Sequence, residues 1–189
     1  AGRYPEVRFL LSHDIHTSRR KYLQKGVPDA ALESAIYFRA HETRTFPCPK
    51  GPLTVSTLRS TDLGVAFLIR CGGRYIYHAG DLNWWLWKGD SKQEAGNMAA
   101  NFKREIDTLA GLTLELAFVP LDPRQEEYYG LGINYLLDTA QIRHLFPMHF
   151  WDDYAVIPRY QAEFPQMAQR TQLHLIEREG QVWELSDEA

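Results

Sequence analysis

The sequence predicts an α/β fold of the α+β kind, in which a strand–helix–strand unit packs on an antiparallel meander. Two observations predict this class. Short β-type runs bounded by turn residues recur between residues 52 and 78, and an amphipathic segment, 91–110, separates them from two further apolar runs. Because a chain of 189 residues suits one domain, we expect 1–189 to form a single unit.

The first half of the chain supplies the meander. Val7–Leu11 is a short apolar run that ends in polar residues, so we predict a buried strand there. A short helix over 18–26 follows and is closed by Gly26. Three further strands are predicted at Pro52–Leu58, Gly64–Arg70 and Arg74–His78. The last two are joined by Cys71-Gly72-Gly73, where the glycines permit a tight hairpin.

The second half supplies the strand–helix–strand unit. Residues 91–110 place apolar side chains at three- and four-residue spacing, which predicts the clearest helix of the chain. A strand at Leu114–Val119, a helix around Tyr135–Gln141 and a strand at Leu145–Met148 should follow. The runs Gln172–Ile176 and Gln181–Leu185 predict a closing hairpin around Glu179-Gly180.

Composition excludes several classes of function. Lys and Arg total 21 against 24 for Asp and Glu, a net charge of -3, so the chain lacks the basic excess of a nucleic-acid-binding protein. It shows neither an apolar leader nor a run of about 20 apolar residues, so we expect no membrane association. The only cysteines, Cys48 and Cys71, form no CxxC motif, and a reducing cytoplasm is the expected location.

Ionisable residues follow three of the predicted strands. His78-Ala79-Gly80-Asp81 follows one, Asp122 another and His149 the third. Strands that end at one sheet edge would bring these side chains together, which is the usual place for a site in an α/β fold. His and Asp are ligands for zinc, manganese or iron. A structural role as strand caps is the alternative for each residue taken singly.

Four stretches resemble the metallo-β-lactamase-fold hydrolases, in particular a group of uncharacterised bacterial members. They are Ser60–Phe67, Tyr75–Trp85, Phe118–Arg124 and Phe146–Tyr154. The resemblance implies an αββα sandwich with a metal site at the edge between its sheets. It further implies that Asp81 is the bridging metal aspartate, that His149 is the last metal histidine, and that His78 orients the loop behind the ligands.

The chain departs from this family at its main signature. HxHxDH, which supplies most metal ligands in the family, occurs nowhere in the 189 residues. Ser12–His16 is the nearest candidate, but Tyr4–Ser12 resembles a segment that follows the signature. We therefore expect the chain to be the C-terminal two-thirds to three-quarters of a full domain, without the first strands. Where wider relatives carry a further metal histidine, this chain offers Asp62 as a substitute.

The resemblance implies a metal-dependent hydrolase whose metal-activated water attacks an ester, amide or phosphoester bond of a small molecule. Zinc is the first expectation, with manganese or iron as alternatives. Asp81 and His149 alone are fewer than the roughly three or four ligands of a zinc site, so we expect weak or absent metal binding and an incomplete active site in this chain.

Aromatic residues flank the proposed ligands and suggest a substrate pocket. We place Trp84, Trp85, Trp151 and Arg124 in it, with packing in the core as the equal alternative for the tryptophans. We expect Asp122 to brace the loop through an ion pair with Arg124. The alternative function is a non-catalytic binding module that uses this tryptophan-lined cleft. An exposed sheet edge would favour a homo-oligomer.

Overall fold

The computed structural model describes residues 7–49 and 51–185. The N-terminal part of the Tyr4–Ser12 segment and both ends of the predicted 1–189 unit lie outside these residues. In chain order the elements are β1 (Leu10–Ser12), α1 (His13–Thr17), α2 (Arg19–Gln24), α3 (Asp29–Glu33), β2 (Ile36–Phe38), β3 (Thr43–Phe46), β4 (Leu53–Arg59), β5 (Val65–Cys71), β6 (Arg74–His78), α4 (Lys92–Ile106), η1 (Asp107–Leu109), β7 (Thr113–Pro120), η2 (Pro123–Tyr128), α5 (Leu131–Thr139), β8 (Gln141–Met148), α6 (Val156–Glu163), α7 (Pro165–Ala168) and β9 (Gln172–Leu173).

One mixed sheet organises the described part of the chain. Its strand order is β3-β4-β5-β6-β7-β8-β9, antiparallel from β3 to β6 and parallel from β6 to β9. The meander β4-β5-β6 is therefore confirmed. The strand–helix–strand unit, however, does not pack on the meander as expected, because β7 pairs directly with β6 and continues the same sheet. The helix α4, the helix α5 and the pair α6–α7 make the three crossovers that these parallel neighbours require.

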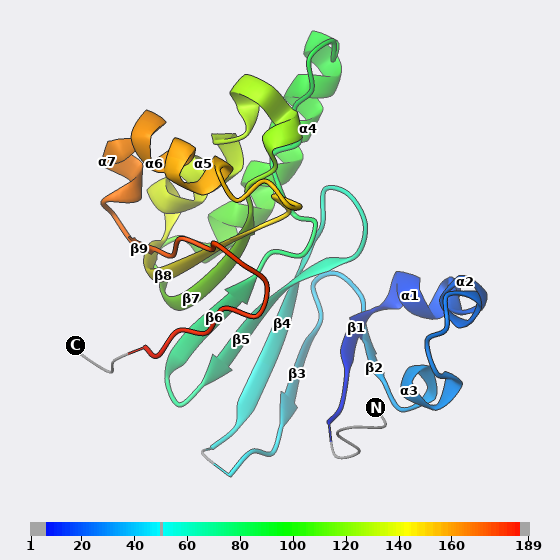
Figure 1. The fold of residues 1–189 in the computed structure, drawn as a ribbon. Helices are drawn as coiled ribbons and strands as arrows, with labels where there is room; N and C mark the ends of the chain where they lie inside the picture. Colours follow the sequence, from blue (N-terminus) through cyan, green and yellow to red (C-terminus); the bar gives the residue numbers. More distant parts are fainter. Residues whose placement is uncertain (1–6, 50, 186–189) are drawn as a thin grey trace.

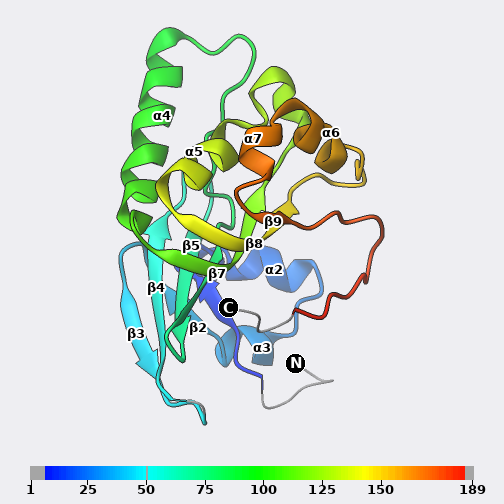
Figure 2. The same cartoon turned by 90° about the vertical axis from the view of Figure 1, so that its left-hand side faces the viewer.

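Helices α4 to α7 cover one face of the large sheet (Figures 1 and 2). Between them lies the core, in which Tyr77, Phe102, Leu114 and Tyr160 are buried completely or almost so. On the opposite face the parallel pair β1-β2 packs through Phe38, whose ring lies 5.9 Å from that of Phe67. The helices α1 to α3 accompany this pair. The layers thus follow the predicted αββα order, with a second sheet of two strands.

The two ends of the chain differ from the prediction. Gln172 and Leu173 pair in parallel with β8, and 181–185 form no strand, so the closing hairpin is wrong. In its place, His174 stacks on Phe146 with ring centroids 4.0 Å apart, and Trp183 packs against both rings. Near the N-terminus the strand begins at Leu10 rather than Val7.

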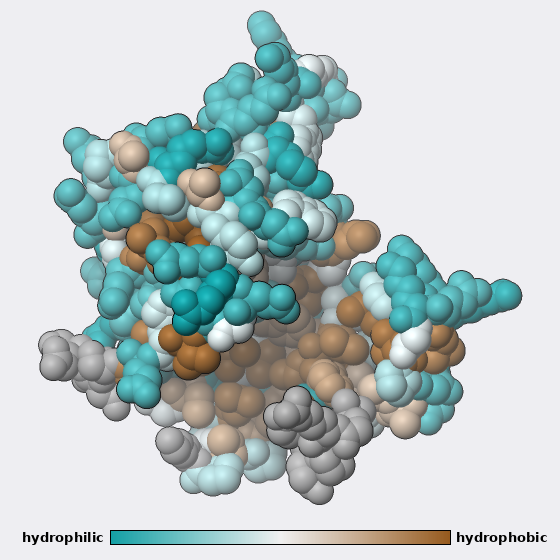
Figure 3. Space-filling model, in the orientation of Figure 1, coloured by the Kyte–Doolittle hydropathy of each residue, from teal (hydrophilic) through white to brown (hydrophobic). Residues whose placement is uncertain are grey.

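A row of half-buried apolar side chains lies on the sheet face that bears Phe67. Register places Phe67, His78 and Phe118 side by side, and Ile69, Ile76 and Leu116 beside them. Figure 3 shows apolar residues gathered in the hollow between these strands and the N-terminal elements β1, β2 and α1 to α3. Among the described residues, no helix has the length and apolar character needed to cross a membrane.

Candidate functional site

Asp81 and His149 come together at one edge of the sheet. They follow β6 and β8, which run parallel on either side of β7, so their loops emerge at the same end. His149 Nε2 lies 3.1 Å from Asp81 Oδ1, with 28% and 36% of the two side chains exposed. Bonds of about 2.0–2.2 Å to one tetrahedral zinc ion separate neighbouring ligand atoms by roughly 3.3 Å. The two side chains thus form a direct His–Asp ion pair, and the same spacing would let both atoms bind one ion.

The loop that carries Asp81 is held by a close backbone approach. Gly80 has φ 54°, and a Cβ there would lie 3.0 Å from the carbonyl oxygen of Val65. Its N–H donates to His78 Nδ1 at 3.1 Å. Desolvation, and then the neighbouring His149, lower the pKa of His78, which keeps that nitrogen available as an acceptor. His78 thus holds the backbone of the loop that carries Asp81.

Strained backbone marks the segment after β8. His149 has φ 62° and Trp151 has φ 55°, values in the left-handed region that residues other than glycine rarely adopt. Such strain costs about 1–3 kcal/mol per residue and clusters at functional sites. Here it turns the His149 imidazole toward Asp81, and the two rings of His149 and Trp85 lie 6.0 Å apart between centroids.

Two further carboxylates, Asp62 and Asp14, act on Asp81 through their charge. Burial raises the pKa of Asp81, and the charges of Asp62 and Asp14 raise it further against the opposing effect of His149. Asp62 is exposed and lines the cleft described below. Asp14, in the first turn of α1, has a buried Oδ1 without a hydrogen-bond partner. The sequence did not single out Asp14.

The two histidines of the Ser12–His16 segment make contacts elsewhere. His13 Nε2 lies 3.0 Å from a guanidinium nitrogen of Arg39, and the ring of His16 meets Tyr37 edge-on at 4.9 Å. Neither histidine lines the cleft beside Asp81.

A cleft of about 390 Å³ opens at the Asp81–His149 pair. Its lining consists of Thr61, Asp62, Asp81, Trp85, Trp87, Met98, Arg124, His149 and Trp151. Trp85 stacks on Trp87 with ring centroids 5.9 Å apart and nearly parallel planes, and its indole N–H donates to the backbone oxygen of Asp81 at 3.0 Å. The predicted pocket residues Trp85, Trp151 and Arg124 therefore share one cleft.

Trp84 does not belong to this lining. It packs between α4 and α5, 6.1 Å from Phe102 and 6.2 Å from Tyr135 between ring centroids, and the Lys103 ammonium lies 4.6 Å over its ring. Trp84 and Trp85 therefore point to different parts of the structure, and only Trp85 and Trp87 of this run line the cleft.

Asp122 and Arg124 form the expected ion pair. Arg124 Nε donates to Oδ1 and Oδ2 of Asp122 at 2.9 and 3.1 Å, and its backbone N–H donates to Oδ1 at 3.0 Å. Burial alone would raise the pKa of Asp122, but the hydrogen bonds from Arg124 outweigh it and hold that pKa below its ordinary value. The Arg124 guanidinium also lies 4.8 Å over the ring of Trp151.

A buried polar network fixes the floor of the site, and sequence reasoning missed it. Asn83, only 2% exposed, donates from Nδ2 to Gln125 Oε1 at 2.9 Å, and Gln125 Nε2 donates to the backbone oxygen of Trp84. Thr61 Oγ1 donates to the backbone carbonyl oxygen of Asn83 and accepts from the backbone N–H of the same residue. Gly132 was the available signal, because a glycine within an apolar helix indicates close approach of another group.

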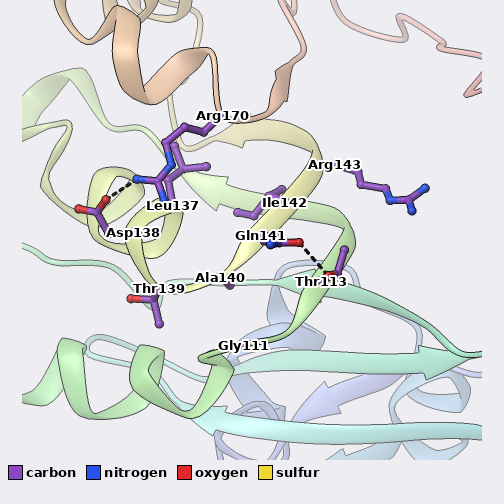
Figure 4. A pocket seen from close by; sticks show the side chains of 10 residues that line it. All are labelled: Gly111, Thr113, Leu137, Asp138, Thr139, Ala140, Gln141, Ile142, Arg143 and Arg170. Atoms are coloured by element: carbon purple, nitrogen blue, oxygen red, sulfur yellow. Dashed lines mark hydrogen bonds and ion pairs between the residues drawn. The ribbon is translucent and has the colours of Figure 1, made fainter. Parts of the chain in front are cut away.

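A larger cleft, about 1010 Å³, lies at the other end of β7 and β8, and Figure 4 shows its side chains. Arg170 pairs with Asp138, and Thr113 donates to Gln141 Oε1 at 3.2 Å. Arg143 extends away from Arg170 and faces Glu115 at 3.7 Å. The two cations therefore do not converge on a common ligand.

Within residues 7–49 and 51–185, no three His, Cys, Asp or Glu side chains are placed to hold one metal ion. The described residues thus fit a metal only in part: Asp81 and His149 have a spacing that would suit two ligands of one ion, and Asp14 Oδ1 is a buried oxygen without a hydrogen-bond partner.

Comparisons with known proteins place the fold. No protein-family model and no curated protein sequence matches the chain. The chain is similar to Igni18, a metallo hydrolase from Ignicoccus hospitalis KIN4/I, with a TM-score of 0.54 and 16% identity over 93% of this chain and 67% of that one. The chain has the metallo-β-lactamase fold. At this identity the likeness shows the fold and not the reaction.

Two further solved structures are similar to the chain at lower TM-scores. A proposed metal-dependent hydrolase from Parabacteroides distasonis ATCC 8503 matches at a TM-score of 0.43 and 9% identity over 79% of this chain and 63% of its own. A proposed zinc-dependent hydrolase of the metallo-β-lactamase superfamily from Thermotoga maritima matches at a TM-score of 0.32 and 12% identity, over 64% of this chain and 53% of its own.

Proposed function

We propose that the protein is a metal-dependent hydrolase of the metallo-β-lactamase superfamily and that Asp81 and His149 are metal ligands. One observation carries the proposal: His149 Nε2 and Asp81 Oδ1, from residues 68 positions apart in the sequence, lie 3.1 Å from each other at a cleft. Strain at His149 favours the same interpretation, because the backbone is held in a costly conformation that presents the ring to Asp81.

Each residue of the site has a defined part in this function. Asp81 and His149 hold the ion, while Trp85 fixes the Asp81 backbone through its indole N–H. A bound divalent ion supplies hydroxide near neutral pH and polarises the scissile ester, amide or phosphoester bond. The charges of Asp62 and Asp14 act on Asp81, but among the described residues neither is placed with the pair as a third ligand. With two close ligands, metal affinity in this chain should be weak unless donors from outside the described residues complete the set.

Metal titration tests the proposal directly. We expect Zn²⁺ or Mn²⁺ to bind at one shared locus in isothermal titration calorimetry and in metal analysis after gel filtration. Asp81→Ala and His149→Ala should each abolish that binding. His16→Ala and Asp138→Asn are matched controls, since these residues lie away from the cleft, and they should bind as the parent does. Binding that survives both site variants refutes the assignment.

A non-catalytic binding module is the second candidate. The observation that favours it is the lack, among the described residues, of a third donor placed beside Asp81 and His149, together with the exposure of Trp87 and Trp151 at the cleft. Stoichiometric metal in the purified protein excludes this candidate. Ligand binding that is unchanged by EDTA and by His149→Ala supports it.

A further inference from the structure

We propose that Arg124, Asp122 and Trp151 make the cleft select an uncharged carbonyl compound with a flat apolar group, such as an aryl or acyl ester or amide, over phosphoesters and other anions. The proposal rests on the proposed function, since it names the substrate class of the same site. It goes further in assigning specificity to three residues that hold no metal.

The charge of Arg124 is already compensated before any ligand enters. The Asp122 side chain is completely buried and accepts from both Nε and Nη2 of Arg124. Arg124 Nη1 makes no hydrogen bond with the described residues, and 56% of the side chain is exposed at the cleft. The pair therefore presents a hydrogen-bond donor without net positive charge, which suits a carbonyl oxygen better than a phosphate.

The cleft offers flat apolar surface beside this donor. Trp151 is 65% exposed although the guanidinium of Arg124 covers one part of its ring at 4.8 Å. Trp87 is 39% exposed and is backed by Trp85 in a parallel stack. Exposed indoles held by neighbouring groups bind a planar ring or an acyl chain with little loss of conformational entropy.

The remaining charges in the cleft disfavour an anion. Asp62 and Asp81 line it together with Arg124, and Arg124 is neutralised by Asp122. A bound divalent ion would be offset by these two carboxylates. Selection between neutral and anionic ligands thus depends on whether the Arg124 charge stays compensated.

Two probes that share a phenyl ring test the proposal. Acetanilide carries a neutral amide, and phenyl phosphate carries an anion of similar size. Binding is measured by ligand-observed NMR titration of the full chain in EDTA, where no metal contributes. We expect acetanilide to bind about tenfold more tightly than phenyl phosphate. Equal or tighter binding of phenyl phosphate overturns the proposal.

Variants assign the effect to the three residues. Trp151→Ala should weaken acetanilide binding about fivefold or more. Tyr22→Ala, which removes an aromatic ring from a separate pocket beside α2, should leave it unchanged. Asp122→Asn should narrow the preference for acetanilide, because it leaves the Arg124 charge free while Asp62 and Asp81 still line the cleft. Asp138→Asn is its control.

Folding of Asp122→Asn is checked by circular dichroism. If this variant does not fold, Arg124→Lys serves instead and should weaken the discrimination, because an ammonium cannot hold both carboxylate oxygens or stack on Trp151. Unaltered selectivity in Trp151→Ala and in the charge variant contradicts the proposal. Because these measurements contain no metal, their failure leaves the metal titration unaffected, and loss of metal binding leaves the selectivity result standing.

Discussion

Gly132 allows a sharp test of the network beneath the site. An alanine Cβ at this position would lie 1.9 Å from Asn83 Oδ1, 3.1 Å from Asn83 Cγ and 3.3 Å from the backbone nitrogen of Trp84. The Asn83 oxygen must therefore move by roughly 1.5 Å to reach ordinary van der Waals contact, which begins at 3.4 Å. Asn83 has little room for this, because its Nδ2 is tied to Gln125.

The magnitude follows from the groups that are disturbed. Breaking the Asn83–Gln125 hydrogen bond and leaving the buried Gln125 oxygen unpaired costs about 1–3 kcal/mol, and overpacking costs a further 1–3 kcal/mol or so. Alanine regains about 1 kcal/mol over glycine within a helix. We expect Gly132→Ala to lower the free energy of unfolding by about 1–5 kcal/mol in urea denaturation followed by circular dichroism.

A double-mutant cycle checks the cause. In an Asn83→Ala background the clashing side chain is gone, so Gly132→Ala should then cost less than about 1 kcal/mol. Equal costs in both backgrounds, or a Gly132→Ala protein as stable as the parent, would show that the close approach of Asn83 is not what requires glycine.

Three further predictions concern charge and strain. The folded-state pKa of Asp122 is lowered below 3.8, so its ion pair with Arg124 stabilises the fold fully above that pH and loses this effect as the pH falls below it. In Asp122→Asn, the free energy of unfolding should therefore depend less on pH in this acidic range. His149→Gly should be about 1 kcal/mol more stable than His149→Ala in urea denaturation, because glycine adopts φ 62° without strain. Glu105→Ala should cost about 2–3 kcal/mol by thermal unfolding, because the buried carboxylate accepts from the Arg59 N–H at 3.0 Å and contacts His41 at 2.8 Å; a cost below about 0.5 kcal/mol would refute this.

The arrangement of the strands that carry the site could be predicted because the local signals agree with the tertiary structure. Apolar runs before Asp81, Asp122 and His149 are buried strands that run in parallel, so their ends meet. By contrast β3 has three exposed residues out of four, and β2 is only three residues long. Neither has a periodic pattern long enough to indicate a strand.

The site itself was predictable only where a residue follows a strand. Trp84 and Trp85 are neighbours of the same type, yet one packs on α4 and the other lines the cleft. Their directions depend on the loop conformation set by Asn83 and Gln125, buried polar residues that no periodicity reveals. Side-chain direction in a loop is a property of the assembled fold, so composition and spacing could not supply it.

The parallel stack of Trp85 on Trp87 places two fluorescent side chains in the lining of the cleft. Two indoles with centroids 5.9 Å apart couple their excited states, and the imidazole of His149 lies 6.0 Å from the nearer ring. Imidazolium quenches indole emission more strongly than neutral imidazole does. Occupancy or protonation at His149 should therefore be visible as a change in emitted light, without any added dye.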